Sequence, residues 1–142
     1  MDIKEIYTQM ILEESRNKAN KHVLEGATAV EKGHNPSCGD EITLQIKVAN
    51  GIIEDAAFVG VGCAISQAST SMMIDLIRGK RVEEAKALAE TFIGMIKKDI
   101  TDEEELEVLE DAIAFQNISN LPARVKCAVL AWHTLSGILE SD

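Results

Sequence analysis

The sequence predicts an α+β fold in which a small antiparallel β-sheet of about three strands is covered by helices. Residues 42–48 alternate between apolar and polar side chains, which indicates a strand with one buried face. Asn50-Gly51 follows, a dipeptide preferred in two-residue hairpin turns because both of its residues tolerate a positive φ. The remaining apolar residues recur mostly at helical spacing, so we expect the helices to cover one face of the sheet.

The first half of the chain is expected to contribute one helix and the strands. Apolar residues at helical spacing predict an amphipathic helix over residues 3–19, frayed at its end. A weaker alternation predicts a short strand over residues 27–32. The hairpin then pairs residues 42–48 with a return strand over residues 52–59.

The second half is expected to be helical. Gly60 and Gly62 end the return strand, and Cys63 begins a helix. Gly79 ends that helix, because glycine readily takes the left-handed conformation of the residue after a helix. Pro122 begins the last helix, where its missing N–H costs nothing. The three later helices are predicted over residues 82–98, 103–114 and 122–139.

The composition is that of one ordinary globular domain spanning residues 1–142. Apolar residues make up 46% of the chain and charged residues 27%, enough for a packed core. No apolar run is long enough to span a membrane, and the first residues lack the pattern of a secretory signal. With unpaired thiols as well, the expected location is the cytoplasm, with no membrane partner.

The charge of the chain argues against nucleic acid as a partner. The 24 Asp and Glu residues exceed the 14 Lys and Arg residues, whereas nucleic-acid binding needs clustered cations. Eight of the thirteen residues in the segment 99–111 are acidic. This acidic run is either a solvated face that promotes solubility or an electrostatic docking site for a basic partner.

Three cysteines carry the functional prediction. Cys38 lies among turn-forming residues, Cys63 begins a helix, and Cys127 falls in the first turns of the last helix. Their odd number cannot close into a set of disulfides. A cysteine is most often a small buried apolar residue, but a turn-rich segment is usually at the surface, and Asp40 adds a carboxylate two residues after Cys38. Three thiols and Asp40 together provide the four ligands that a tetrahedral zinc site requires.

Other interpretations of these residues are open from the pattern alone. Asp40 would be a simple turn cap if the cysteines were absent. A structural zinc domain usually has closely spaced Cys pairs, whereas 24 residues separate Cys38 from Cys63. A Cys–His hydrolase needs a histidine beside its thiol, and no motif links a thiol to any of the histidines, which are His22, His34 and His133.

The sequence around each cysteine resembles a known family. The segments Asn35-Pro36-Ser37-Cys38-Gly39-Asp40, Gly62-Cys63-Ala64-Ile65-Ser66 and Pro122-Ala123-Arg124-Val125-Lys126-Cys127 resemble iron–sulfur cluster assembly scaffolds of the IscU and NifU amino-terminal family. The resemblance runs from about residue 6 to residue 139. It implies a SufE/NifU-like fold, a small sheet covered by helices.

Three departures make the chain more similar to the SufU branch of that family. Lys126 stands where the scaffold branch usually has a histidine before its third cysteine. The Leu-Pro-Pro-Val-Lys segment of that branch appears here as Leu-Pro-Ala-Arg over residues 121–124. The interval from Cys63 to Cys127 contains 63 residues and is longer than in the scaffolds, with the extra length in the acidic run.

The resemblance implies a zinc held by Cys38, Asp40, Cys63 and Cys127. It further implies that Cys38 accepts persulfide sulfur from a SufS-like cysteine desulfurase, in the manner of a sulfurtransferase, and that Arg124 lies near the reacting thiol. The alternative is a scaffold on which the same ligands build a labile [2Fe–2S] cluster. Downstream partners would be a cluster scaffold or apo iron–sulfur proteins.

Overall fold

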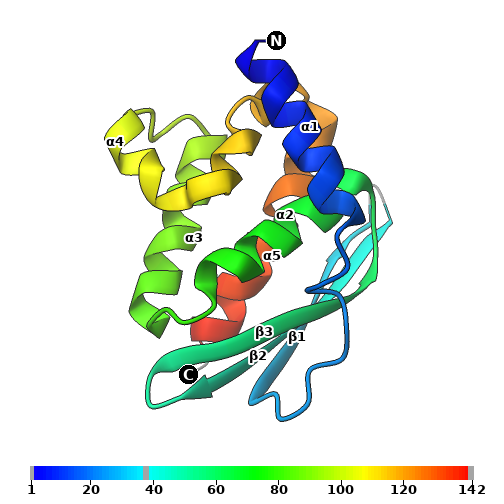
Figure 1. Cartoon of the computed structure of the whole chain (residues 1–142), viewed down its shortest axis with the longest axis vertical. Helices are drawn as coiled ribbons and strands as arrows, with labels where there is room; N and C mark the ends of the chain where they lie inside the picture. Colours follow the sequence, from blue (N-terminus) through cyan, green and yellow to red (C-terminus); the bar gives the residue numbers. More distant parts are fainter. Residues whose placement is uncertain (1, 37–38, 141–142) are drawn as a thin grey trace.

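The computed structural model describes residues 2–36 and 39–140, and it has the predicted α+β architecture. A three-stranded antiparallel sheet in the order β1-β2-β3 forms one side of the molecule, and the helices gather on the other side (Figure 1). Helices α2 and α5 pack directly against the strands. Within the described residues, no helix is long and apolar enough to cross a membrane.

The sheet confirms the predicted hairpin and corrects the first strand. Strand β2 covers Asp40–Ala49 and β3 covers Ile52–Val61. The turn between them has φ of 54° at Asn50 and 77° at Gly51, as that dipeptide predicts. Strand β1 covers Ala29–Asn35, later than the expected residues 27–32.

Gly33 explains why the sequence does not predict the last residues of β1. It interrupts the apolar–polar alternation, although it pairs with Ile42 in the sheet. A Cβ atom at this position would overlap the Thr134 hydroxyl of α5. The glycine therefore permits the last helix to lie close against the first strand, and this contact leaves no periodic signal in the sequence.

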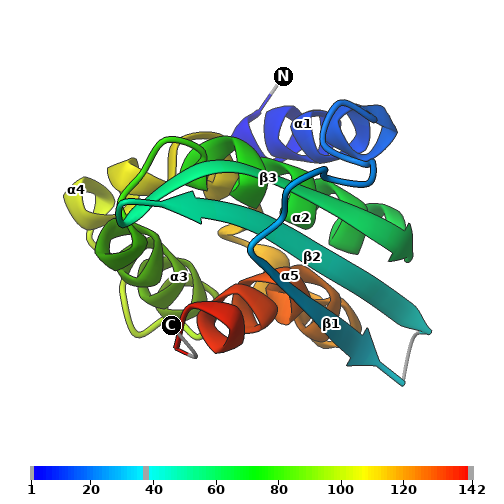
Figure 2. The same cartoon turned by 90° about the horizontal axis from the view of Figure 1, so that it is seen from below.

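The long helices agree with the predicted segments to within a few residues. Helix α1 ends at Arg16, and Arg78 and Gly79 end α2, with Gly79 at φ 84° as a left-handed residue after a helix. The four long helices are α1 Ile3–Arg16, α2 Ala64–Ile77, α3 Val82–Ile96 and α5 Pro122–Glu140. All four lie on the same side of the sheet (Figure 2).

The prediction of a single helix over residues 103–114 is wrong. A short helix α4, Glu103–Leu106, passes into the 3₁₀ segment η1, Glu107–Phe115, and η2 follows over Ile118–Asn120. The backbone breaks at Glu110, whose φ is 49°. Buried side chains recur at every third position, which is the repeat of a 3₁₀ helix; they are Leu106, Leu109, Ala112, Phe115 and Ile118.

The core joins the helices through Trp132, which is fully buried. Its ring stacks on Phe92 of α3 with ring centroids 4.1 Å apart. Its indole N–H donates to the Ser69 hydroxyl over 2.9 Å, and that hydroxyl donates to the Ala128 carbonyl over 2.6 Å. Ser69 thus connects α2 to α5 at two points of the apolar interior.

Replacing Ser69 with Ala should lower the free energy of unfolding by about 1–3 kcal/mol, because the buried indole N–H of Trp132 would lose its acceptor. Urea unfolding followed by circular dichroism measures the loss. In a Trp132→Phe background there is no indole N–H to strand, so Ser69→Ala should cost less there. An equal cost in both backgrounds would show that the Trp132–Ser69 hydrogen bond does not stabilise the fold.

Candidate functional site

Three of the four predicted ligand residues meet at one end of the sheet. Asp40 is the first residue of β2, Cys63 is the N-cap of α2, and Cys127 lies in the second turn of α5. One carboxylate oxygen and the two sulfur atoms lie within 4.8 Å of one another. Residues far apart in the chain therefore form one cluster, which we call the Asp-Cys-Cys cluster.

The register of the sheet brings Asp40 and Cys63 together. Strand β3 runs antiparallel to β2 and ends with Val61 opposite Glu41, so the chain leaves the sheet beside Asp40. The Cys63 N–H donates to Asp40 Oδ1 over 2.9 Å, and the Cys63 sulfur lies 4.0 Å from Asp40 Oδ2. Asp40 is fully buried, and a buried carboxylate is costly unless such donors compensate it.

Two glycines make this close approach possible. Gly60 has φ of 132°, and a Cβ atom there would overlap the Glu41 carbonyl of the neighbouring strand. A Cβ atom at Gly62 would lie 3.0 Å from Asp40 Oδ1 and would overlap the Ser66 hydroxyl. Ser66 in turn donates to the Cys63 carbonyl over 3.2 Å, within the first turn of α2. The Gly-Cys pair of the sequence thus has a steric reason, while the part played by Ser66 was not predicted.

The packing of α2 on α5 places Cys127. The Ser69–Ala128 hydrogen bond lies beside Cys127 in the chain and fixes the two helices to each other. Cys127 is 1% exposed, whereas Cys63 is half-buried at the helix terminus. The two sulfur atoms of the cluster therefore differ in their access to solvent.

Cys38, the predicted sulfur acceptor and fourth ligand, lies outside the described residues. The described residues on either side of it are Pro36 and Gly39. Gly39 donates its N–H to the Asn35 carbonyl over 3.0 Å, and its φ of 74° is a conformation that favours glycine. In the sequence Cys38 is two residues before Asp40, so its assignment to the site stays a prediction.

Basic side chains are exposed near the cluster. Arg124 and Lys126 lie on the first turns of α5, and Lys126 lines a cavity of about 260 Å³ together with His34 and His133. His34 and His133, to which no role is assigned, thus share this cavity with Lys126. Glu41 of β2 follows Asp40 in the chain. The pKa of Glu41 is lowered because Lys32 of β1 donates a hydrogen bond to its carboxylate and brings a positive charge beside it.

The donor set of the cluster suits zinc. Zinc binds thiolate sulfur at about 2.3 Å and carboxylate oxygen at about 2.1 Å, so ligand atoms of one ion lie of the order of 4 Å apart. The spread of the Asp-Cys-Cys cluster is compatible with that spacing. Soft thiolates select zinc or iron–sulfur clusters over hard ions such as magnesium. The cluster could therefore supply three ligands to either kind of centre.

Comparison with known proteins places the chain among cluster assembly proteins. Residues 6–138 match the model of the family described as NifU-like N-terminal domain. The iron–sulfur cluster assembly scaffold protein IscU of Thermotoga maritima is 44% identical over 140 residues, covering 99% of this chain and 96% of that protein. The zinc-dependent sulfurtransferase SufU of Bacillus subtilis is 41% identical over 139 residues, covering 96% and 92%.

Solved structures show the same architecture. The crystal structure of FiSufU from Fervidobacterium islandicum AW-1, a protein assigned as an iron–sulfur cluster assembly scaffold for the SUF system, superposes with a TM-score of 0.88 at 41% identity. The match covers 95% of this chain and 97% of that protein. Both the predicted fold and the predicted resemblance are thereby confirmed.

Replacing Asp40 with Ala should lower the free energy of unfolding by about 1–3 kcal/mol even with a chelator present, because the Cys63 N–H would lose its buried acceptor. Asp40→Asn keeps a side-chain oxygen at that position and should cost less. Thermal unfolding in EDTA measures both variants without a contribution from metal. If Asn were as destabilising as Ala, the hydrogen bond to Cys63 would not be the source of the effect.

Proposed function

The chain belongs to the NifU-like N-terminal domain family, and we propose that it is a zinc-dependent sulfur acceptor in iron–sulfur cluster assembly. It would take persulfide sulfur from a SufS-like cysteine desulfurase and pass it to a cluster scaffold or to apo iron–sulfur proteins. The observation that carries the proposal is the Asp-Cys-Cys cluster, with two thiols and one carboxylate within 4.8 Å. A relative that is 41% identical over 139 residues is named a zinc-dependent sulfurtransferase.

We propose Cys38, Asp40, Cys63 and Cys127 as the zinc ligands. When bound, zinc keeps its thiol ligands deprotonated. Asp40 and Cys127 are buried, which suits ligands that hold a metal in place. Cys63 is the N-cap of α2, and its sulfur lies 4.0 Å from Asp40 Oδ2, so both groups can face one ion.

The transfer step needs an accessible thiolate, and we assign it to Cys38, the ligand that would leave the zinc in order to react. The Cys38 thiolate attacks the outer sulfur of the persulfide on the desulfurase; a new S–S bond forms on Cys38 while the donor S–S bond breaks. The electron pair leaves with the donor cysteine as a thiolate, so no external oxidant or reductant is consumed. Arg124, exposed three residues before Cys127, would stabilise the anionic persulfide because its guanidinium stays charged.

The scaffold function is the second candidate, since the Thermotoga maritima relative is named a scaffold. The same four residues would then hold a [2Fe–2S] cluster, and the oxygen ligand from Asp40 would make it easier to release. Lys126 replaces the histidine that the scaffold branch usually has before its third cysteine. That replacement removes one candidate ligand, so the sulfur acceptor remains the first choice.

Protein purified without chelator should contain about one zinc per chain by plasma mass spectrometry, as one tetrahedral site requires. Asp40→Ala, Cys63→Ser and Cys127→Ser should each lower zinc retention by about tenfold or more, because loss of a ligand leaves an incomplete site. Glu107→Ala changes an exposed carboxylate elsewhere and should leave the zinc content unchanged. Full zinc content in all three cluster variants would contradict the ligand assignment.

Cys38→Ser should abolish sulfur-35 transfer from a SufS-like desulfurase, because the acceptor thiol is missing. Arg124→Ala should slow the transfer by about tenfold, and Arg124→Lys should slow it less because the positive charge is kept. Gel electrophoresis of labelled protein, with alkylation to detect the persulfide, measures the transfer.

Two outcomes would contradict the sulfur-acceptor proposal. Cys38→Ser protein that still accepts sulfur would refute the assignment of the acceptor. A brown protein with charge-transfer absorption that activates an apo-ferredoxin, without accepting persulfide, would establish the scaffold function instead.

A further inference from the structure

A groove of about 660 Å³ lies between α3 and the α4–η1 segment, on the acidic run of the chain. Its apolar lining comes from Ala87 and Leu88 of α3 and from Val108 of η1. Val108 is 52% exposed, because it falls outside the three-residue repeat of buried side chains in its segment. We call this feature the acidic groove.

Carboxylates outnumber cations along the acidic groove. Glu84, Glu105 and Glu110 line it, against the single cation Lys80. Among the described residues, no salt bridge includes any of the eight carboxylates between Asp99 and Asp111. The negative charge around the groove is therefore not neutralised by pairing within the chain.

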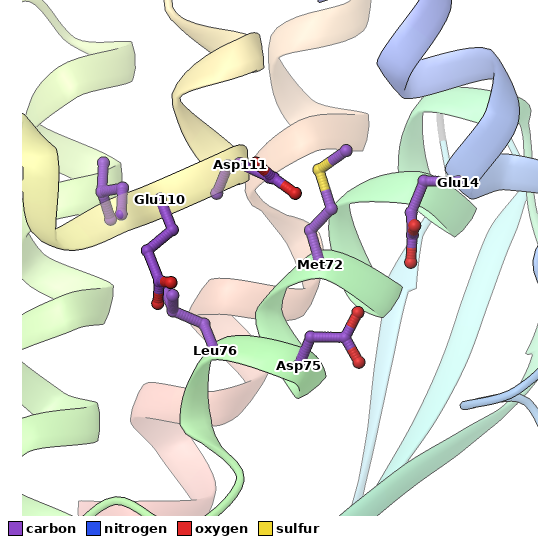
Figure 3. Close-up of a pocket in the computed structure, with 8 residues that line it drawn as sticks. Glu14, Met72, Asp75, Leu76, Glu110 and Asp111 are labelled. Atoms are coloured by element: carbon purple, nitrogen blue, oxygen red, sulfur yellow. The ribbon is translucent and has the colours of Figure 1, made fainter.

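A second hollow of about 140 Å³, drawn in Figure 3, adjoins the acidic groove. The two share Glu110 in their lining. Met72 and Leu76 of α2 give this acidic hollow an apolar floor. Carboxylates from three elements surround it, namely Glu14 of α1, Asp75 of α2, and Glu110 and Asp111 of η1. A Lys or Arg side chain has the matching character, an apolar stem with a cationic end.

Two of these carboxylates are already held in place. Glu14 Oε1 accepts a hydrogen bond from the Ser71 hydroxyl over 2.6 Å, and Asp75 Oδ1 accepts one from the Asn20 amide over 2.9 Å. Asp75 Oδ1 also forms a salt bridge with Arg78 Nη1 over 3.4 Å. Both carboxylates are therefore preorganised, so a cation entering the acidic hollow would not have to order them. Arg78 balances part of the charge of Asp75, whereas no salt bridge among the described residues includes Glu14.

We propose that the acidic groove and the acidic hollow together form a docking surface for a basic amphipathic segment of a partner protein. Apolar side chains of the segment would lie on Ala87 and Val108, as in other helix-in-groove complexes. Its Lys or Arg side chains would face the carboxylates of the acidic groove and of the acidic hollow, which gives charge complementarity. A second copy of a chain with net charge −10 would bring like charge to this surface, and so would an anionic membrane.

The docking surface lies away from the Asp-Cys-Cys cluster. Cys63 caps the N-terminus of α2, whereas Asp75 and Leu76 of the acidic hollow are near its C-terminus. At a rise of 1.5 Å per residue, the twelve steps from Ala64 to Leu76 span about 18 Å. A partner bound at this surface would leave the cluster accessible, and the inference does not depend on the chemistry of the cluster.

The test uses three fluorescein-labelled peptides of about 16 residues, a length that gives about four helical turns. One carries a leucine face flanked by lysines, the second replaces the lysines with glutamates, and the third replaces the leucines with serines. Only the leucine–lysine peptide should bind saturably in fluorescence anisotropy. Its affinity should fall as salt is raised, because salt screens the exposed charges.

Variants locate the bound peptide. Val108→Glu and Glu105→Lys should each weaken binding by about tenfold, since they alter the groove itself. Glu107→Lys makes the same charge change as Glu105→Lys in the same acidic run, but Glu107 lines neither the acidic groove nor the acidic hollow. It should therefore weaken binding less than threefold. All three positions are exposed, so thermal unfolding should confirm that the variants fold.

Several results would overturn the proposal. The first is that the leucine–lysine peptide does not bind, and the second is that the leucine–glutamate peptide binds equally well. The third is that Glu107→Lys weakens binding as much as Glu105→Lys, which would indicate general electrostatic attraction to the acidic run rather than binding in the groove. Light scattering that shows a dimer broken by Val108→Glu would assign the surface to a second copy of the chain. Sulfur-35 acceptance is measured on the same variants. A failure of the docking proposal can then be distinguished from a failure of the proposed sulfur transfer.

Discussion

The end of the molecule that carries the Asp-Cys-Cys cluster depends on one buried carboxylate. Asp40 accepts the N–H of Cys63 and so ties the start of β2 to the N-terminus of α2. The helix N-terminus has N–H groups without helical partners, and the carboxylate has no solvent. The N–H group gains an acceptor and the carboxylate gains a donor. As a result, the thiol of Cys63 is brought close to the carboxylate. The glycine before Cys63 is required because any side chain there would push the two apart.

Helix α2 connects this end of the molecule to the rest. Cys63 caps its N-terminus, its middle reaches Trp132 through Ser69, and its last turns line the acidic hollow with Asp75 and Leu76. The helix is buried along most of its length, with its inward hydroxyl groups bonded to carbonyls or carboxylates. Such a helix has little freedom to shift, so the sites at its two ends keep fixed positions.

Sequence patterns were sufficient where local geometry decides the structure. The period-two alternation and the Asn50-Gly51 turn determine how β2 pairs with β3, and that pairing sets Asp40 beside Cys63. The position of Cys127 depends instead on how α2 packs against α5, through contacts such as Ser69–Ala128 that are 59 positions apart, and no local period encodes such a contact. The 3₁₀ segment escaped prediction because apolar spacing of three, as from Leu106 to Leu109, fits both helix types over a short stretch.

The unequal burial of the cluster bears on how its members divide their work. Cys127 and Asp40 have almost no contact with solvent, so neither can meet a sulfur donor on another protein without local unfolding. Cys63 is partly exposed, but its backbone is fixed by Asp40 and by the first turn of α2. A thiol that reacts with a partner needs access as well as thiolate character. Under the proposed function, the buried pair and Cys63 therefore stay on the metal during the transfer. The ligand that leaves and reacts is Cys38, the thiol in the turn-forming segment between β1 and β2.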